Sequence, residues 1–110
     1  LRVGCEICED IWVPLSPSIS HAMEGATILV NLSASNETIG KDSYRELLVK
    51  SASAKLIAGY IYCSCAGGES TQDLVFGGHD LIAENGTILT QSKKFESQII
   101  YGDIDIKRLQ

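Results

Sequence analysis

The sequence lacks any run of 18 apolar residues, so no segment is long enough to span a bilayer as a helix. It also lacks an excess of positive charge, since 9 Lys and Arg stand against 14 Asp and Glu. The resulting net charge of −5 argues against nucleic acid or a membrane surface as a partner. Internal repeats are missing too. What remains is 45% hydrophobic and 21% charged residues over 110 positions, which predicts one small globular domain.

The four cysteines are even in number, which permits two disulfides, and three Asn-x-Ser/Thr triplets add the possibility of a secreted glycoprotein. We favour reduced thiols in a cytoplasmic protein, because Asn31 lies in an apolar stretch and Asn85-Gly86 is typical of a turn. The chain does not begin with Met, and we expect it to be part of a longer product.

Hydrophobic periodicity and turn signals predict an α/β fold with a mixed sheet. A capping-box pattern, Ser43-x-x-Glu46, marks the start of the longest predicted helix. Asn85-Gly86 predicts a type I′ hairpin. The predicted strands are 2–8, 26–32, 60–65, 74–76, 81–84, 87–90 and 98–106, and the predicted helices are a short one from Ser16-Pro17 to Gly25 and a long one over 43–58.

Cys8 is the candidate nucleophile, because it ends the first apolar strand, where a sheet edge faces a cleft. A thiol of ordinary pKa, about 8.5, needs a base or a cation to activate it. The backbone N–H of Glu9 follows directly and is placed to stabilise a tetrahedral oxyanion. The alternative for Cys8 alone is a buried structural cysteine. The two histidines, His21 and His79, are interpreted as structural or surface residues.

A metal or redox site is the other use for these cysteines, since Cys5 and Cys8 form C-x-x-C and Cys63 and Cys65 form C-x-C. Residues i and i+3 of a strand point to opposite faces, so Cys5 and Cys8 should not converge. We therefore predict no metal site and inert thiols at the other three positions. The stretch 67–71 resembles a phosphate loop only weakly, because it has no Lys.

The segment around the candidate nucleophile, Val-Gly-Cys-Glu-Ile-Cys8-Glu-Asp-Ile-Trp12, resembles the nitrilase (carbon–nitrogen hydrolase) superfamily. Within it, the chain is similar to the glutaminase domains of glutamine-dependent NAD⁺ synthetases. The similarity continues in one register through the stretches 29–35, 40–45, 68–79, 82–86 and 99–105.

This resemblance implies a Glu–Lys–Cys triad in which Cys8 attacks the side-chain amide of glutamine. In the family the Glu is the general base, the Lys helps to hold the oxyanion, and both precede the cysteine by more than the seven residues present here. The family's synthetase domain follows this region and uses ATP and Mg²⁺ to amidate nicotinic acid adenine dinucleotide. We therefore expect no cofactor in these 110 residues, no synthetase domain, and no glutaminase activity from residues 1–110 alone.

The resemblance also implies that Ser35 and Lys41 bind the amino-acid end of glutamine, with Lys41 at its carboxylate. The alternative for Lys41 is a solvated lysine at a helix entry. We expect residues 1–110 to form the C-terminal half of a four-layer αββα sandwich, which exposes an apolar sheet face and favours homo-oligomers. Two other functions stay open: a different nitrilase-superfamily amidase, and a non-catalytic assembly module.

Overall fold

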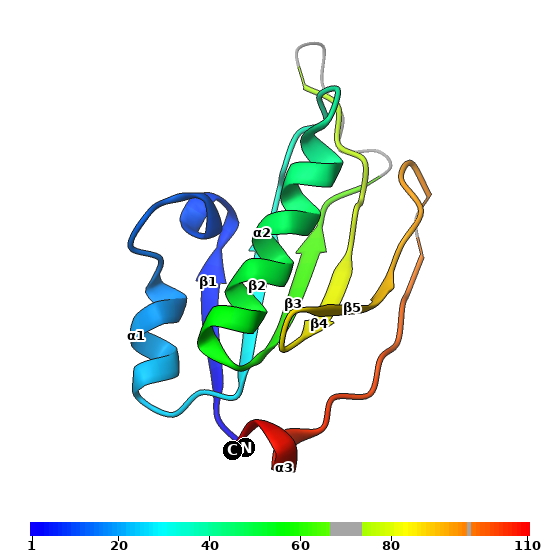
Figure 1. Cartoon of the computed structure of the whole chain (residues 1–110). Coiled ribbons are helices and arrows are strands. Elements are labelled where there is room, and N and C mark those ends of the chain that lie inside the picture. The colour runs from blue at the N-terminus through cyan, green and yellow to red at the C-terminus, as the bar shows by residue number, and fades with distance from the viewer. Residues whose placement is uncertain (67–73, 97) are drawn as a thin grey trace.

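The computed structural model describes residues 1–66, 74–96 and 98–110 (Figure 1). These residues form one sheet, three α-helices and a short 3₁₀ helix, η1, which directly follows the first strand. In chain order the elements are β1 (Val3–Ile7), η1 (Cys8–Trp12), α1 (Pro17–Met23), β2 (Ile28–Ser33), α2 (Lys41–Leu56), β3 (Gly59–Ser64), β4 (Leu81–Glu84), β5 (Thr87–Gln91) and α3 (Ile106–Leu109).

The five strands lie in the order β1-β2-β3-β4-β5, parallel from β1 to β3 and antiparallel from β3 to β5. This confirms the predicted mixed α/β sheet. In the β4–β5 turn, Asn85 has φ 44° and Gly86 has φ 89°, the two positive values that a type I′ hairpin requires. Parallel pairing brings the carboxyl ends of β1, β2 and β3 to one edge of the sheet, where ligands bind in such folds.

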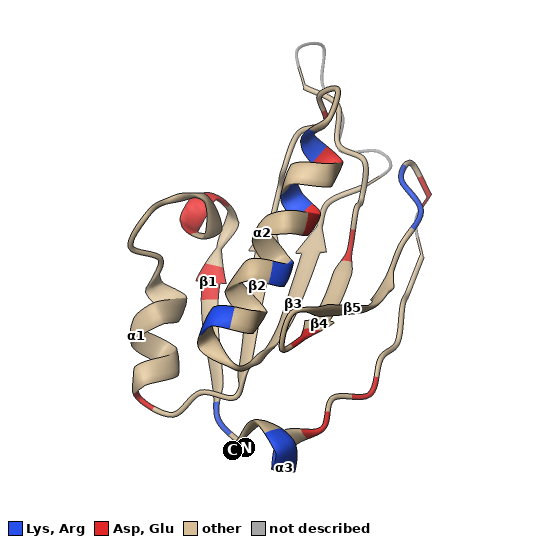
Figure 2. Ribbon diagram, in the orientation of Figure 1, with Lys and Arg blue, Asp and Glu red and all other residues tan. Residues whose placement is uncertain are grey.

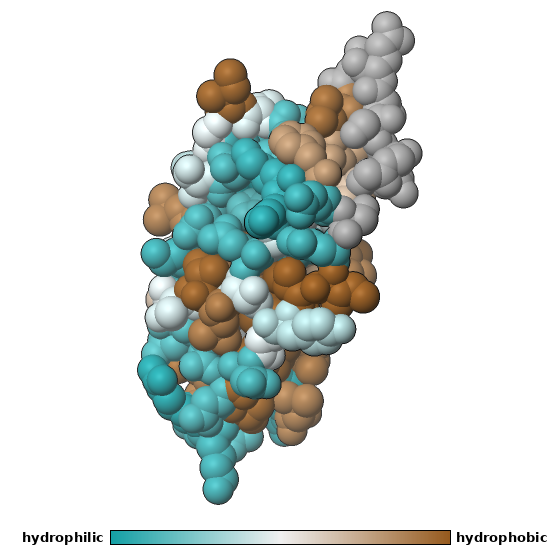
Figure 3. All heavy atoms as spheres, turned by 90° about the vertical axis from the view of Figure 1, so that its right-hand side faces the viewer, coloured by the Kyte–Doolittle hydropathy of each residue, from teal (hydrophilic) through white to brown (hydrophobic). Residues whose placement is uncertain are grey.

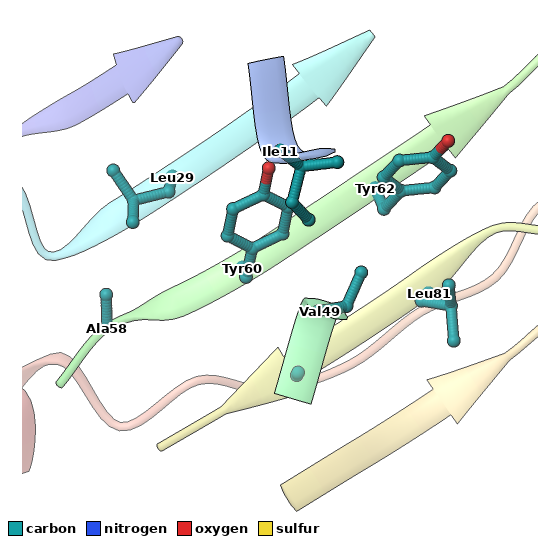
Figure 4. Packing of buried hydrophobic residues seen from close by; sticks show 8 residues of the cluster. Ile11, Leu29, Val49, Ala58, Tyr60, Tyr62 and Leu81 are labelled. Carbon is teal, nitrogen blue, oxygen red and sulfur yellow. The ribbon is translucent and has the colours of Figure 1, made fainter. Parts of the chain in front are cut away.

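Helices α1 and α2 cover the same face of the sheet. Gly4 of β1 lies against His21 of α1, since a Cβ at Gly4 would stand 2.6 Å from the His21 Cβ. Glu6 points to the same face as Gly4 by strand alternation, and it accepts a hydrogen bond from the Tyr60 hydroxyl. Tyr60 in turn belongs to a buried cluster with Val49 of α2. The core therefore lies between the sheet and these helices, as Figure 4 shows for the residues around Tyr60.

Helix α2 begins two residues earlier than predicted. Its N-cap is Gly40, whose φ of 81° is left-handed, and no side chain caps it, so Ser43 and Glu46 lie within the helix. The predicted capping box is therefore wrong, because the glycine already supplies the backbone turn that starts the helix. Figure 2 shows residues of both charge signs interspersed along α2. Val49 on the inner side of α2 packs in the core, and Arg45 of the same helix is buried as well.

Two predicted strands are absent from the sheet. At 74–76 only Phe76 pairs, through a single bridge to Asn36. Residues 98–105 form no ladder and instead cross the face of the sheet opposite α2, behind β4 in Figure 4. Ile104 packs on Gly59 there, and Gly102 packs on Ile82. The alternation of this segment therefore comes from lying across a sheet, with alternate residues facing it, rather than from pairing in one.

The opposite face of the sheet is only partly covered. Beyond the C-terminal segment, Val3, Ile7 and Leu32 are 56%, 62% and 58% exposed, and Cys5 and Cys63 are exposed beside them. This confirms the predicted exposed apolar face. Figure 3 views the molecule from the β5 side and shows a broken apolar band between hydrophilic regions.

Among the described residues, no helix has the length and hydropathy needed to cross a membrane.

Candidate active site

A cleft of about 300 Å³ opens at the carboxyl ends of β1 and β2. It brings together all four residues that the sequence predicts for the site. Its lining consists of Cys8, Glu9, Trp12, Ala34, Ser35, Asn36 and Lys41. The nucleophile segment follows β1 directly, and the remaining residues come from the β2–α2 connection and the first turn of α2. The topology of the sheet therefore accounts for the meeting of segments that are about 25 residues apart.

Cys8 adopts a left-handed backbone conformation, with φ 51°, as the chain leaves β1 and enters η1. Such a conformation is unfavourable for a residue with a Cβ and costs about 1–3 kcal/mol. The turn is supported on one side by Asp10, whose carboxylate accepts the Ile7 N–H at 2.8 Å. Cys8 itself is half-buried, so its thiol stands at the cleft without being sealed in the core.

Asn31 of β2 holds the backbone of Cys8 on both sides. Its Oδ1 accepts the Cys8 N–H at 3.0 Å, and its Nδ2 donates to the Cys8 carbonyl at 3.2 Å. Asn31 is fully buried, and its Nδ2 also donates to the Tyr60 hydroxyl at 3.2 Å. This role of Asn31 was not predicted from the sequence. An amide in the middle of an apolar strand was the available signal, because a buried polar group requires partners.

Behind Asn31, the Tyr60 hydroxyl donates to Glu6 Oε1 at 2.8 Å, and both residues are buried. Burial raises the pKa of Tyr60 well above its ordinary value, and the Glu6 carboxylate raises it further. The hydroxyl therefore keeps its proton and continues to donate to Glu6. The orientation of the nucleophile turn thus depends on a chain of buried hydrogen bonds that runs from β1 through β3 to β2.

Lys41 forms the positively charged wall of the cleft. Its Nζ donates to Asn36 Oδ1 at 2.7 Å and lies 5.4 Å from the centre of the Trp12 ring. Trp12 in turn stacks on Tyr44 at 5.2 Å with an interplanar angle of 17°. A cation over an aromatic face is stabilised by the ring electrons. No ion pair to Lys41 occurs among the described residues, which leaves its ammonium group available for an anion in the cleft.

Cys8 is the one cysteine that lines the cleft among the described residues. None of the four cysteines, all of which lie in the described ranges, forms a disulfide. The His21 ring contacts the Cys5 carbonyl at 2.9 Å, and His79 lies in a buried cluster with Arg45, so neither histidine lines the cleft. The described ranges hold no group of three His, Cys, Asp or Glu side chains suited to a metal ion. The phosphate-loop-like stretch 67–71 lies outside the described residues.

The fold and the cleft define the class: an α/β protein that presents a cysteine thiol, in a left-handed turn, at the carboxyl edge of a parallel sheet. The model of the carbon–nitrogen hydrolase family matches residues 1–110, so the chain belongs to that family.

Individual relatives agree with this assignment. The glutamine-dependent NAD(+) synthetase of Mycobacterium tuberculosis (strain H37Rv) is 45% identical over 107 residues, which is 96% of this chain and 16% of that protein. The glutamine-dependent NAD+ synthetase of Acinetobacter baumannii superposes with a TM-score of 0.78 at 26% identity, over 87% of this chain and 18% of that one. A Saccharomyces cerevisiae member of the nitrilase superfamily shares the fold, with a TM-score of 0.74 at 24% identity over 86% of this chain and 34% of that one.

Proposed function

We propose that residues 1–110 are the C-terminal, nucleophile-bearing part of a glutaminase domain of a glutamine-dependent NAD⁺ synthetase. The observation that carries the proposal is the cleft that joins Cys8 and Glu9 to Ser35 and Lys41. The 45% identity to a glutamine-dependent NAD(+) synthetase over 96% of the chain supports it. The chain spans only 16% of that relative, so the activity of the whole protein belongs to this proposal.

In the proposed reaction, the Cys8 thiolate attacks the side-chain amide carbon of glutamine, and a C–S bond forms as the carbonyl oxygen becomes an oxyanion. The Glu9 N–H, next to the nucleophile, donates to that oxyanion. Collapse of the intermediate breaks the C–N bond, and ammonia leaves with a proton from the general base. Water then attacks the thioester, which releases glutamate and returns the thiol.

Ser35 and Lys41 hold the amino-acid end of the substrate in this proposal, with Lys41 at the carboxylate. The Glu base and the oxyanion Lys implied by the family precede Cys8 by more than seven residues, so residues 1–110 alone remain predicted to be inactive. The released ammonia would amidate nicotinic acid adenine dinucleotide in a synthetase domain that uses ATP and Mg²⁺. That no cofactor is held by these 110 residues stays a prediction.

The test is affinity labelling of the natural polypeptide that carries this sequence, at its full length. A glutamine analogue with an electrophilic ketone in place of the amide should label Cys8 in a 1:1 ratio, and free glutamine should protect it. Cys8→Ser should lower glutamine hydrolysis by at least about a thousandfold, since the nucleophile is lost. The matched control is Cys63→Ser, an exposed thiol outside the cleft, which should retain activity.

Label on another cysteine, or hydrolysis that survives Cys8→Ser, would refute the assignment of the nucleophile. Protection by a nitrile or by an unrelated amide, without protection by glutamine, would instead indicate a different amidase of the superfamily. An unreactive Cys8 in the full-length polypeptide would favour a non-catalytic assembly module.

A further inference from the structure

Arg45, in the second turn of α2, is completely buried and lies behind the cleft. Its Nη1 makes an ion pair with Glu37 Oε1 at 2.8 Å and also approaches His79 Nδ1 at 2.9 Å. Its Nη2 donates to Ser35 Oγ at 3.2 Å. A buried guanidinium is tolerated only when paired, and Glu37, almost as deeply buried, supplies the counter-charge. The guanidinium of Arg45 is therefore fixed in place, and its Nη2 is bonded to Ser35, a residue that lines the cleft.

The chemistry of these groups fixes the direction of each hydrogen bond. A guanidinium has only donors, so Ser35 Oγ must accept from Arg45, and the hydroxyl hydrogen of Ser35 stays available for another acceptor. The same reasoning makes His79 Nδ1 an acceptor, which places the ring proton on Nε2, where it donates to Gln91 Oε1 at 2.9 Å. The tautomer of His79 thus follows from its hydrogen-bond partners.

Lys41, which lines the cleft together with Ser35, is also a donor. The Lys41 ammonium has three hydrogens and no acceptor, and among the described residues it makes one hydrogen bond, to Asn36 Oδ1. Ser35 and Lys41 therefore both offer hydrogens to whatever occupies the cleft. A carboxylate accepts hydrogen bonds and carries the opposite charge to Lys41, so it is the group that fits.

We infer that Arg45 is a positioning residue that fixes Ser35 as a hydrogen-bond donor and so makes this end of the cleft selective for a substrate carboxylate. The inference rests on the proposed function and extends it to a residue that does not line the cleft. Arg45→Lys keeps the charge opposite Glu37 but loses the forked shape that reaches Ser35 and His79 together.

The experiment compares two electrophiles on the natural full-length polypeptide: the glutamine analogue with its free carboxylate, and the same compound with that carboxylate converted to a primary amide. The measured quantity is the ratio of their labelling rates at Cys8. We expect the unmodified protein to react at least about tenfold faster with the carboxylate form, which is the factor that one charge-assisted hydrogen bond contributes. Ser35→Ala and Arg45→Lys should each lower this preference by a similar factor, and the part that remains comes from the charge of Lys41.

A double-mutant cycle separates positioning from general damage. If Arg45 acts through Ser35, Arg45→Lys changes the ratio no further once Ser35 is Ala. The matched control is Gln91→Ala, which removes the hydrogen-bond partner of His79 Nε2 and leaves the contacts of Arg45 in place. It should change the ratio by less than about twofold, which is less than the loss of a typical hydrogen bond would cause. If Arg45→Lys does not fold, the pair Arg45→Gln with Glu37→Gln, which removes both buried charges together, is measured in its place.

The outcomes are distinct. A ratio near one in the unmodified protein overturns carboxylate recognition, and with it both the proposed roles of Ser35 and Lys41 and this inference. A ratio that falls in Ser35→Ala but persists in Arg45→Lys overturns the inference alone, and the proposed function stands. A further fall in the double variant would likewise show that Arg45 acts elsewhere.

Discussion

At the scale of single residues, the site depends on how a strained turn is held. Cys8 has a left-handed backbone, and a single buried amide, that of Asn31, bonds both its N–H and its carbonyl. An isolated cysteine at the end of an apolar strand is predictable from the sequence. The pair of hydrogen bonds between Asn31 and Cys8 is not predictable, because the two residues are 23 positions apart and meet only through the register that pairs Ile7 with Leu32.

Replacing Asn31 with Leu, a side chain of similar volume, should lower the free energy of unfolding by about 2–4 kcal/mol, because three hydrogen bonds are lost at a buried position. Urea unfolding measures the change. The control is Tyr60→Phe, which removes one hydroxyl from the same network and should cost about 1–2 kcal/mol. Equal urea midpoints for Asn31→Leu and the unmodified chain would refute the claim that the Asn31 hydrogen bonds stabilise the Cys8 turn.

At the scale of elements, the long helix and the β4–β5 hairpin were predictable because their signals are local. Asn85-Gly86 specifies its own turn, and the apolar spacing of α2 specifies its length to within a few residues. The segment 98–106 was predicted wrongly because an alternating pattern reports only which residues face a sheet. Whether such a segment pairs in the sheet or lies across it depends on distant strands.

Asp80 ties β3 to the start of β4, since its carboxylate accepts the Ser64 N–H at 2.8 Å. Burial raises the pKa of Asp80 above its ordinary value, although the bond from Ser64 opposes this. Between the unfolded and the folded pKa the native state therefore holds more protons, and stability falls as pH rises. Asp80→Asn keeps the acceptor oxygen and abolishes the titration. Its free energy of unfolding, relative to the unmodified chain, should increase from pH 4 to pH 7.

Asp42 provides a control of opposite sign. Its exposed carboxylate pairs with Lys94 at 3.1 Å, and this hydrogen bond lowers the pKa of Asp42. The stability that it contributes is present above the unfolded pKa and is lost as pH falls through the folded pKa. The free energy of unfolding of Asp42→Asn, relative to that of the unmodified chain, should therefore decrease from pH 4 to pH 7. Urea unfolding at both pH values compares the two variants, and trends of the same sign would contradict the electrostatic argument.

At the scale of the whole molecule, the sheet has one face packed by helices and one face largely open. Homo-oligomerisation of this chain is our proposal, and the partial exposure of that apolar face supports it. Leu32 on this face and Leu47 on α2 are both 58% exposed, which makes them a matched pair. Leu32→Glu should shift the 110-residue chain toward the monomer in sedimentation equilibrium, and Leu47→Glu should not. Equal effects of the two substitutions, or a monomer without either, would contradict the proposal.

The bond between Asn31 and Cys8 also links the order of folding to the reactivity of the sulfur. Until β2 pairs with β1, the Cys8 turn lacks both hydrogen bonds from Asn31, and of the bonds described above only the local one between Asp10 and Ile7 supports it. The Cys8 thiol is therefore held in its final orientation at the cleft only after β2 has paired with β1.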